Sequence, residues 1–107
     1  MNREADHARE TQKTIAALLR NTGAAHGAYE ERELNGVYDQ NWPTWYAAYA
    51  GQHGLGNLLS TTLTVEELSR LLKQYDEDYR KERPAENWPD YYAARLADHM
   101  GLVQQPE

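Results

Sequence analysis

The residues of this chain best suited to chemistry are a histidine and a glutamate one helical turn apart, His26 and Glu30. Side chains four positions apart share one face of a helix, so this spacing can present two ligands to one metal ion. Metal sites in helical bundles draw further ligands from facing helices, and Asp39 and His53 are the obvious candidates. A metal-binding hypothesis therefore uses His26, Glu30 and His53, with a divalent metal as the cofactor.

The histidines also have simpler interpretations. A histidine at a core position needs partners for its ring nitrogens, so His26 is also consistent with a buried hydrogen bond to a glutamate or tyrosine. An exposed His26 is the third possibility. His53 and His99 each fall near the end of an expected helix, where a cation gains from the helix dipole, so capping or packing is their first interpretation. The alternative is that these two histidines meet across a twofold axis and share an ion.

The most distinctive pattern is the sequence Asn-Trp-Pro-x-(Trp/Tyr)-Tyr-Ala-Ala, which occupies residues 41–48 and again 87–94. The offset between 41 and 87 is 46 residues, and a constant offset over a long span indicates an internal duplication. Without a gap, the same offset pairs His53 with His99, Tyr29 with Tyr75, Glu30 with Asp76 and Glu31 with Glu77.

These aromatic residues support two interpretations. In the first, the residue before each proline adopts a non-helical backbone conformation and the proline starts a helix. The indole then fills the corner, that is, the turn that the chain makes at the Trp-Pro step. In the second, the aromatic side chains line a pocket or a partner-binding face, because Tyr and Trp combine an apolar body with a polar tip. The chain has eight Tyr and three Trp but no Phe, a bias that is typical of partly solvent-exposed surfaces such as interfaces and ligand pockets. The candidate ligand- or partner-binding residues are Trp42, Trp45, Tyr46, Trp88, Tyr91 and Tyr92.

The helices expected around these motifs follow from their caps and breakers. Thr64 and Glu67 form a capping box, which predicts a helix over about 65–83 that stops at Pro84. Pro89 suits a first helical position, and its helix is expected to end near Met100 with Gly101 as the cap.

In the first half, a helix is expected over 4–20 and another over 22–35, the second interrupted by Gly23 and Gly27 and stopped at Asn35-Gly36. Pro43 opens a further helix that closes near Gly54, and residues 54–62 read as a linker. The predicted fold is all-α: internally duplicated helical hairpins form a four-helix core, with an N-terminal helix laid across it. We expect a single domain over 1–107, divided into an N-terminal helix (1–21), a first repeat (22–55) and a second repeat (64–102).

Composition narrows the class of partner. Eleven basic residues against 17 acidic ones give a net charge of −6, which disfavours nucleic acid and anionic membranes. Cysteine is absent, which excludes disulfides, thiolate metal sites and a cysteine nucleophile. No apolar stretch approaches the roughly 20 residues needed to span a bilayer, so a cytoplasmic, unanchored protein is expected.

Residues 26–30 (His-Gly-Ala-Tyr-Glu) and 42–48 (Trp-Pro-Thr-Trp-Tyr-Ala-Ala) resemble a motif of small bacterial proteins common in actinobacteria. In those proteins a His-x-x-Tyr-Glu stretch precedes Asp/Asn-Trp-Pro-x-Trp-Tyr-Ala. The resemblance covers residues 22–54 and implies a helical module of bacterial origin with no established activity. The second copy departs from the motif, with Leu72 in place of the histidine and Tyr91 in place of the second tryptophan.

Three functional hypotheses follow. The leading one is a non-enzymatic module that binds a protein partner or a small ligand through its aromatic residues, expected as a homodimer. The alternative is a metal-binding helical protein, including a metal-dependent enzyme, that uses His26, Glu30 and His53. A regulatory partner of another protein is the third.

Overall fold

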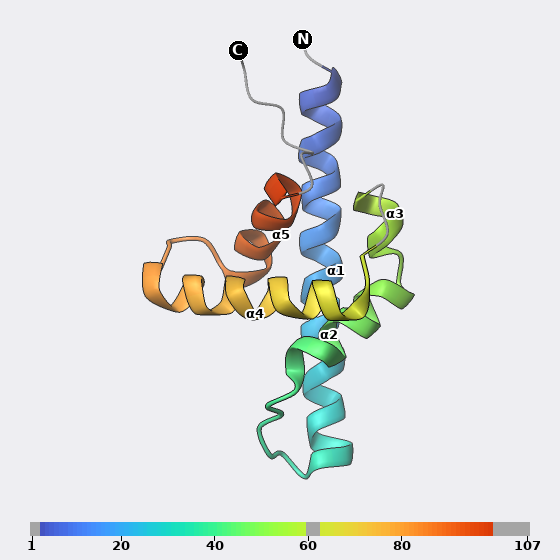
Figure 1. The fold of residues 1–107 in the computed structure, drawn as a ribbon, viewed down its shortest axis with the longest axis vertical. Helices are drawn as coiled ribbons and strands as arrows, with labels where there is room; N and C mark the ends of the chain where they lie inside the picture. Colours follow the sequence, from blue (N-terminus) through green and yellow to red (C-terminus); the bar gives the residue numbers. More distant parts are fainter. Residues whose placement is uncertain (1–2, 60–62, 100–107) are drawn as a thin grey trace.

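The computed structural model describes residues 3–59 and 63–99, with side chains placed from Arg9 onward, and every regular element in these ranges is a helix (Figure 1). The helices are α1 (Arg3–Leu34), α2 (Trp42–Gln52), α3 (Leu55–Leu59), α4 (Val65–Glu82) and α5 (Trp88–His99). The all-α prediction is confirmed.

The first helix is longer than the sequence suggested. A break near residue 21 was expected, but α1 runs without interruption through it, so the separate N-terminal helix was wrong. The reason is one buried stripe formed by Ile15, Leu19, Thr22 and His26, spaced at three or four residues and at most 5 % exposed. The hydroxyl of Thr22 is satisfied by the carbonyl of Leu18 at 2.7 Å, which allows a polar residue inside this stripe.

The ends of the helices largely follow the predicted signals. Asn35 and Gly36 adopt φ angles of 53° and 80°, which end α1 as expected of an Asn-Gly pair. Thr64 and Glu67 form the predicted capping box at the start of α4, and left-handed Arg83 ends that helix before Pro84. The prolines of the two Trp-Pro steps lie buried in the first turns of α2 and α5. The predicted cap at Gly101 lies outside the described residues.

The expected linker 54–62 contains the short helix α3. Its terminal residues Leu55 and Leu59 are buried, and α3 packs against α1 and α2. Their spacing of four residues puts both leucines on one face, a pattern hidden by the surrounding glycines. Residues 60–62 lie outside the described ranges.

The helices pack mainly across the two halves of the chain. α5 packs against α1, and α2 packs against α4, more extensively than neighbours along the chain pack with each other. Figure 1 shows α1 as a long spine, with α4 crossing in front of it and α5 beside its N-terminal part. All five helices contribute buried side chains to the core. Consequently α1 and α4 face each other across a space that α2 and α5 border.

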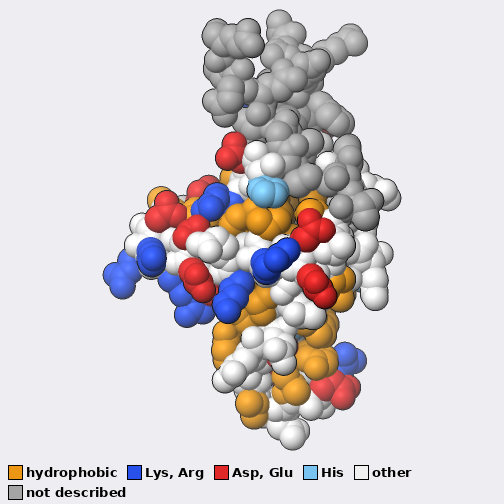
Figure 2. Space-filling model, viewed as in Figure 1, with side chains coloured by type: hydrophobic (Ala, Val, Ile, Leu, Met, Phe, Trp, Pro, Cys, Tyr) orange, Lys and Arg blue, Asp and Glu red, His pale blue; other side chains and the backbone are white. Residues whose placement is uncertain are grey.

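The exposed face is mixed in charge. Figure 2 shows acidic and basic side chains interspersed over α4, whereas hydrophobic side chains gather lower down, over α2 and the end of α1. The exposed large hydrophobic residues among those described include Val37 and Tyr38, which lie in the loop between α1 and α2. No helix within the described ranges is both long enough and apolar enough to cross a membrane.

Candidate functional site

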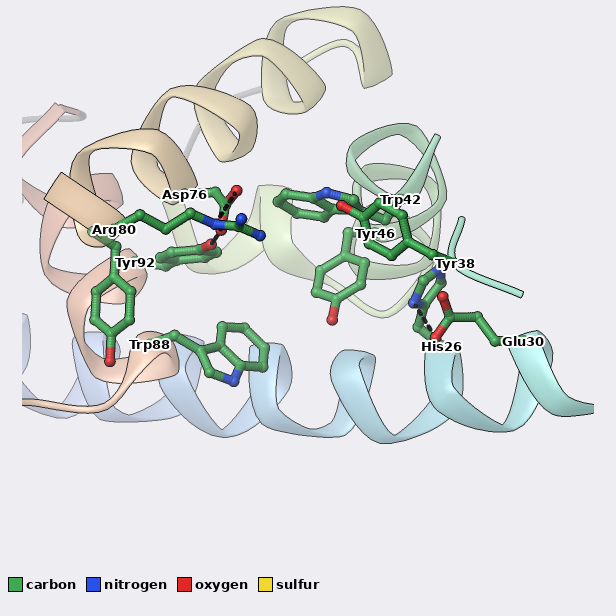
Figure 3. A pocket seen from close by; sticks show the side chains of 10 residues that line it. His26, Glu30, Tyr38, Trp42, Tyr46, Asp76, Arg80, Trp88 and Tyr92 are labelled. Carbon is green, nitrogen blue, oxygen red and sulfur yellow. Dashed lines mark hydrogen bonds and ion pairs between the residues drawn. The ribbon is translucent and has the colours of Figure 1, made fainter. Parts of the chain in front are cut away.

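A cavity of about 390 Å³ lies between α1 and α4, with α2 and α5 at its sides (Figure 3). Its volume is at the lower end of the roughly 300–1,000 Å³ typical of small-molecule sites. The lining combines aromatic rings with a few ionisable groups. The lining residues are His26, Glu30, Tyr38, Trp42, Tyr46, Asp76, Tyr79, Arg80, Trp88 and Tyr92.

Two similar tryptophan–tyrosine pairs form the aromatic wall. Trp42 and Tyr46 meet edge to face with ring centroids 5.1 Å apart, and Trp88 and Tyr92 meet in the same manner at 5.3 Å. Each pair is spaced i, i+4 on one helix, α2 or α5, directly after the Trp-Pro start. Tyr46 and Trp88 join the pairs across the cavity at 6.0 Å. The two Trp-Pro corners, 46 residues apart in sequence, therefore face one space.

One end of the cavity holds an ion pair on α4. The Arg80 guanidinium donates to Asp76 at 3.2 Å, and the Tyr92 hydroxyl donates to the same carboxylate at 3.3 Å. In Figure 3 the Arg80 side chain extends over the cavity toward Trp42 and Tyr46. Asp76 is thus fully engaged by a cation and a phenol.

The other end holds His26, which is 5 % exposed, and two carboxylates. The His26 Nε2 atom lies 2.9 Å from Asp39 Oδ2, and its Nδ1 atom lies 3.8 Å from Glu30 Oε1. Glu30 Oε2 also accepts the backbone amide of Asp39 at 3.1 Å. The loop after α1 is therefore tied back to that helix by a buried histidine and a glutamate. His26 is buried and hydrogen-bonded, but its partner is Asp39 and not the expected glutamate or tyrosine.

The electrostatic environment acts on the lining tyrosines. Burial, followed by the charges of Glu30 and Asp76, raises the pKa of Tyr46 from its ordinary 10.0 to about 12. Burial, followed by Asp76, also raises the pKa of Tyr92. Both phenols are therefore protonated at neutral pH, and the Tyr92 hydroxyl already donates its proton to Asp76.

The six aromatic residues singled out from the sequence divide into two groups. Trp42, Tyr46, Trp88 and Tyr92 line the cavity. Trp45 lies behind His26, with ring centroids 4.9 Å apart, and stacks on Tyr49 at 5.3 Å.

Tyr91 packs on Tyr79 at 5.1 Å, away from the cavity lining. Its hydroxyl donates to Glu82 and accepts from Arg95, so it belongs to a polar cluster between α4 and α5. The helical repeat explains the division, because residues one position apart point in different directions from the same helix.

The predicted metal ligands are not brought together. His26 and Glu30 meet at the cavity end, but His53 is exposed at the C-cap of α2, where it stacks on Tyr49 and its Nδ1 lies 2.8 Å from the Tyr49 carbonyl. Within residues 3–59 and 63–99, no group of three or more His, Cys, Asp or Glu side chains is placed to hold a metal ion. His53 thus fits its capping interpretation.

Four lining residues were not predicted from the sequence: Tyr38, Asp76, Tyr79 and Arg80. In the sequence, Asp76 and Arg80 have the i, i+4 spacing of an ordinary ion pair on a solvated helix face. Such a pair needs no functional explanation, so these residues were not singled out. A usable signal was nevertheless present. The offset of 46 residues pairs Glu30 with Asp76, and it also pairs Trp42 with Trp88 and Tyr46 with Tyr92.

Comparison with known proteins assigns neither a family to the chain nor a function to this cavity. No family model matches the chain, and neither a curated protein nor a solved structure matches it significantly.

Proposed function

We propose that this protein is a non-enzymatic module that binds a small molecule in the cavity between α1 and α4. The observation that supports this most is the convergence of four aromatic side chains from two distant segments on one cavity with ionisable groups at both ends. Binding sites for small molecules have this composition: apolar and aromatic walls with a few placed polar groups. The aromatic wall supplies contact area, and the polar ends supply orientation.

Binding rather than catalysis is favoured by the state of the polar groups. Tyr46 and Tyr92 hold their protons more tightly than free tyrosine, so they are poor nucleophiles at neutral pH. Asp76 is engaged by Arg80 and Tyr92, and Asp39 by His26. Groups tied in this way position a ligand and are poorly placed to exchange protons with it.

We also propose that the two halves are copies of one helical unit related by a pseudo-twofold axis. The matched geometry of the Trp42–Tyr46 and Trp88–Tyr92 pairs supports this. So does the exchange of packing partners, α1 with α5 and α2 with α4, which a twofold relation between two hairpins requires. On this proposal the cavity lies near the axis and arose where the two copies meet. The homodimer and the cytoplasmic location stay predictions of the sequence.

The test is a titration of ¹⁵N-labelled protein with a set of small aromatic and aliphatic compounds, followed by the tryptophan indole signals in NMR spectra. Trp42 and Trp88 line the cavity and Trp45 does not, so the first two signals should move together and saturate at one midpoint. The Trp45 signal should move less.

Matched variants separate the site from the fold. Trp42→Phe removes a lining indole and should weaken binding several-fold, whereas Trp45→Phe, on the same helix, should change affinity little. Binding that shifts only Trp45, or that Trp45→Phe weakens more than Trp42→Phe does, contradicts the proposed site.

A further inference from the structure

The charges around the cavity favour a positive ligand. Two carboxylates line the cavity, those of Glu30 and Asp76, and the one guanidinium among the lining residues is that of Arg80. The carboxylate of Asp39 is not part of the lining and is paired with His26. Asp76 is paired with Arg80 and Asp39 with His26, which leaves the carboxylate of Glu30 as the excess negative charge in the lining. An anionic ligand would enter against this field, whereas a cation is drawn into it.

The aromatic wall acts in the same direction. The faces of indole and phenol rings carry partial negative charge, and cations within about 6 Å of them are attracted, most strongly by tryptophan. Trp42 and Trp88 both line the cavity, together with Tyr46 and Tyr92. A site with two tryptophans and two tyrosines beside carboxylates therefore matches the requirements of an ammonium group that cannot donate many hydrogen bonds.

The two ends of the cavity differ in one respect that selects where a ligand cation would lie. At one end Asp76 is already neutralised by Arg80, whose guanidinium extends over the cavity (Figure 3). In the first half the residue corresponding to Arg80 at the offset of 46 is Leu34, which has no charge. Among the described residues Glu30 has no Lys or Arg partner; its carboxylate accepts the backbone amide of Asp39 and lies 3.8 Å from His26 Nδ1. The Glu30 end is therefore the one where a counter-charge is missing.

We propose that the cavity binds a small organic cation with an alkylated ammonium group, held by the rings of Trp42 and Tyr46 and by the carboxylate of Glu30. This inference rests on the proposed function and specifies its ligand class. Burial is the main cause of the raised pKa of Tyr46, and the negative charges of Glu30 and Asp76 add to it. These two charges act on the same cavity and would stabilise such a cation. The small volume fits a compact ammonium compound such as choline.

The test compares choline with dimethylbutanol, the uncharged alcohol in which carbon replaces the nitrogen, by isothermal titration calorimetry on the full chain. Shape and apolar area are nearly equal in the two probes, so their difference reports the charge. Choline should bind about tenfold more tightly than dimethylbutanol. Benzoate, as an anionic probe for the Arg80 end, should bind more weakly than choline.

Two glutamate variants locate the counter-charge. Glu30→Gln should weaken choline binding about fivefold or more and leave dimethylbutanol binding unchanged. Glu31→Gln removes the same charge from the neighbouring, exposed position of α1 and should change neither. Circular dichroism melting curves verify that both variants are folded.

The outcomes distinguish the ligand class from the binding site itself. Equal affinity for choline and dimethylbutanol overturns the cation inference while leaving a ligand-binding cavity in place. Tighter binding of benzoate overturns it in favour of an anion at Arg80. Binding of neither choline nor dimethylbutanol also overturns it, and the indole titration with other compounds then decides the proposed function separately. An equal loss of choline binding in Glu30→Gln and Glu31→Gln assigns the effect to overall charge and overturns the role of Glu30.

Discussion

Two glycines one turn apart on α1, Gly23 and Gly27, should respond in opposite ways to alanine. A Cβ atom at Gly23 would lie 2.8 Å from Cζ2 and 3.1 Å from Cη2 of Trp88, and 3.3 Å from the Tyr46 hydroxyl. A Cβ atom at Gly27 would meet nothing within 4 Å. Gly23 is therefore the point where the indole of Trp88 lies directly on the backbone of α1, and Gly27 is its matched control.

The magnitudes follow from two opposing effects. Each substitution gains about 1 kcal/mol of helix propensity, because glycine is the weaker helix former. At Gly27 this gain stands alone, so Gly27→Ala should stabilise the protein by up to about 1 kcal/mol. At Gly23 the added methyl group must displace a tryptophan ring between α1 and α5, and overpacking of this kind costs about 1–3 kcal/mol. The two variants should therefore differ by about 1–3 kcal/mol, with Gly23→Ala the less stable.

Equilibrium urea unfolding followed by circular dichroism measures this difference. With the slope of about 1–2 kcal/mol/M usual for small proteins, the two midpoints should be separated by about 1 M. Gly23→Ala should also perturb the indole signal of Trp88 in NMR spectra, whereas Gly27→Ala should not. Equal midpoints for the two variants would refute the packing of Trp88 against α1, and a destabilising Gly27→Ala would refute a continuous helix at that point.

Three further predictions concern the caps, the loop and the tyrosines. Thr64→Ala removes the capping box of α4 and should cost about 1 kcal/mol in urea unfolding; an unchanged midpoint contradicts the cap. Asp39→Asn weakens the hydrogen bond to buried His26 and should lower the free energy of unfolding by about 1–3 kcal/mol. An unchanged free energy of unfolding would show that this hydrogen bond does not stabilise the fold. Burial raises the pKa of both Tyr46 and Tyr75 from 10.0 to about 12, so their contribution to stability is complete below pH 10 and is lost as the pH rises from 10 to 12. Ultraviolet titration of the phenolates should show late-ionising tyrosines in the native protein, and ionisation of every tyrosine near pH 10 without unfolding contradicts their burial.

Local signals in the sequence were sufficient for most helix boundaries. The capping box at Thr64, the Asn35-Gly36 stop and the Trp-Pro helix starts each act through neighbouring backbone groups, so spacing alone identifies them. The continuity of α1 was missed because Gly23 and Gly27 indicated interruptions, and because its buried stripe includes two polar residues, Thr22 and His26. Each is buried only because a partner, the Leu18 carbonyl or Asp39, satisfies its polar atoms.

The candidate site was predictable in part. The sequence singled out six aromatic residues of the Trp-Pro motifs as candidates for a pocket or binding face, and four of them line the cavity. It could not separate Trp42 and Tyr46, which line the cavity, from Trp45 between them. That division depends on which face of α2 meets α4. Asp76 and Arg80 were not recognised because an i, i+4 ion pair on a helix needs no further partner. Only the fold shows that this pair lies across the cavity from Glu30.

The measurement that tests the central claim most directly is the nuclear Overhauser effect between the rings of Tyr46 and Trp88 in the free protein. Every proposal made here depends on the two Trp-Pro corners facing one cavity, and these rings, with centroids 6.0 Å apart, are where the corners meet. We predict cross-peaks between the Trp88 indole and both the Tyr46 ring and the Gly23 α-protons. Trp88 signals that lack any contact with Tyr46 and Gly23 in a folded sample would contradict the shared cavity.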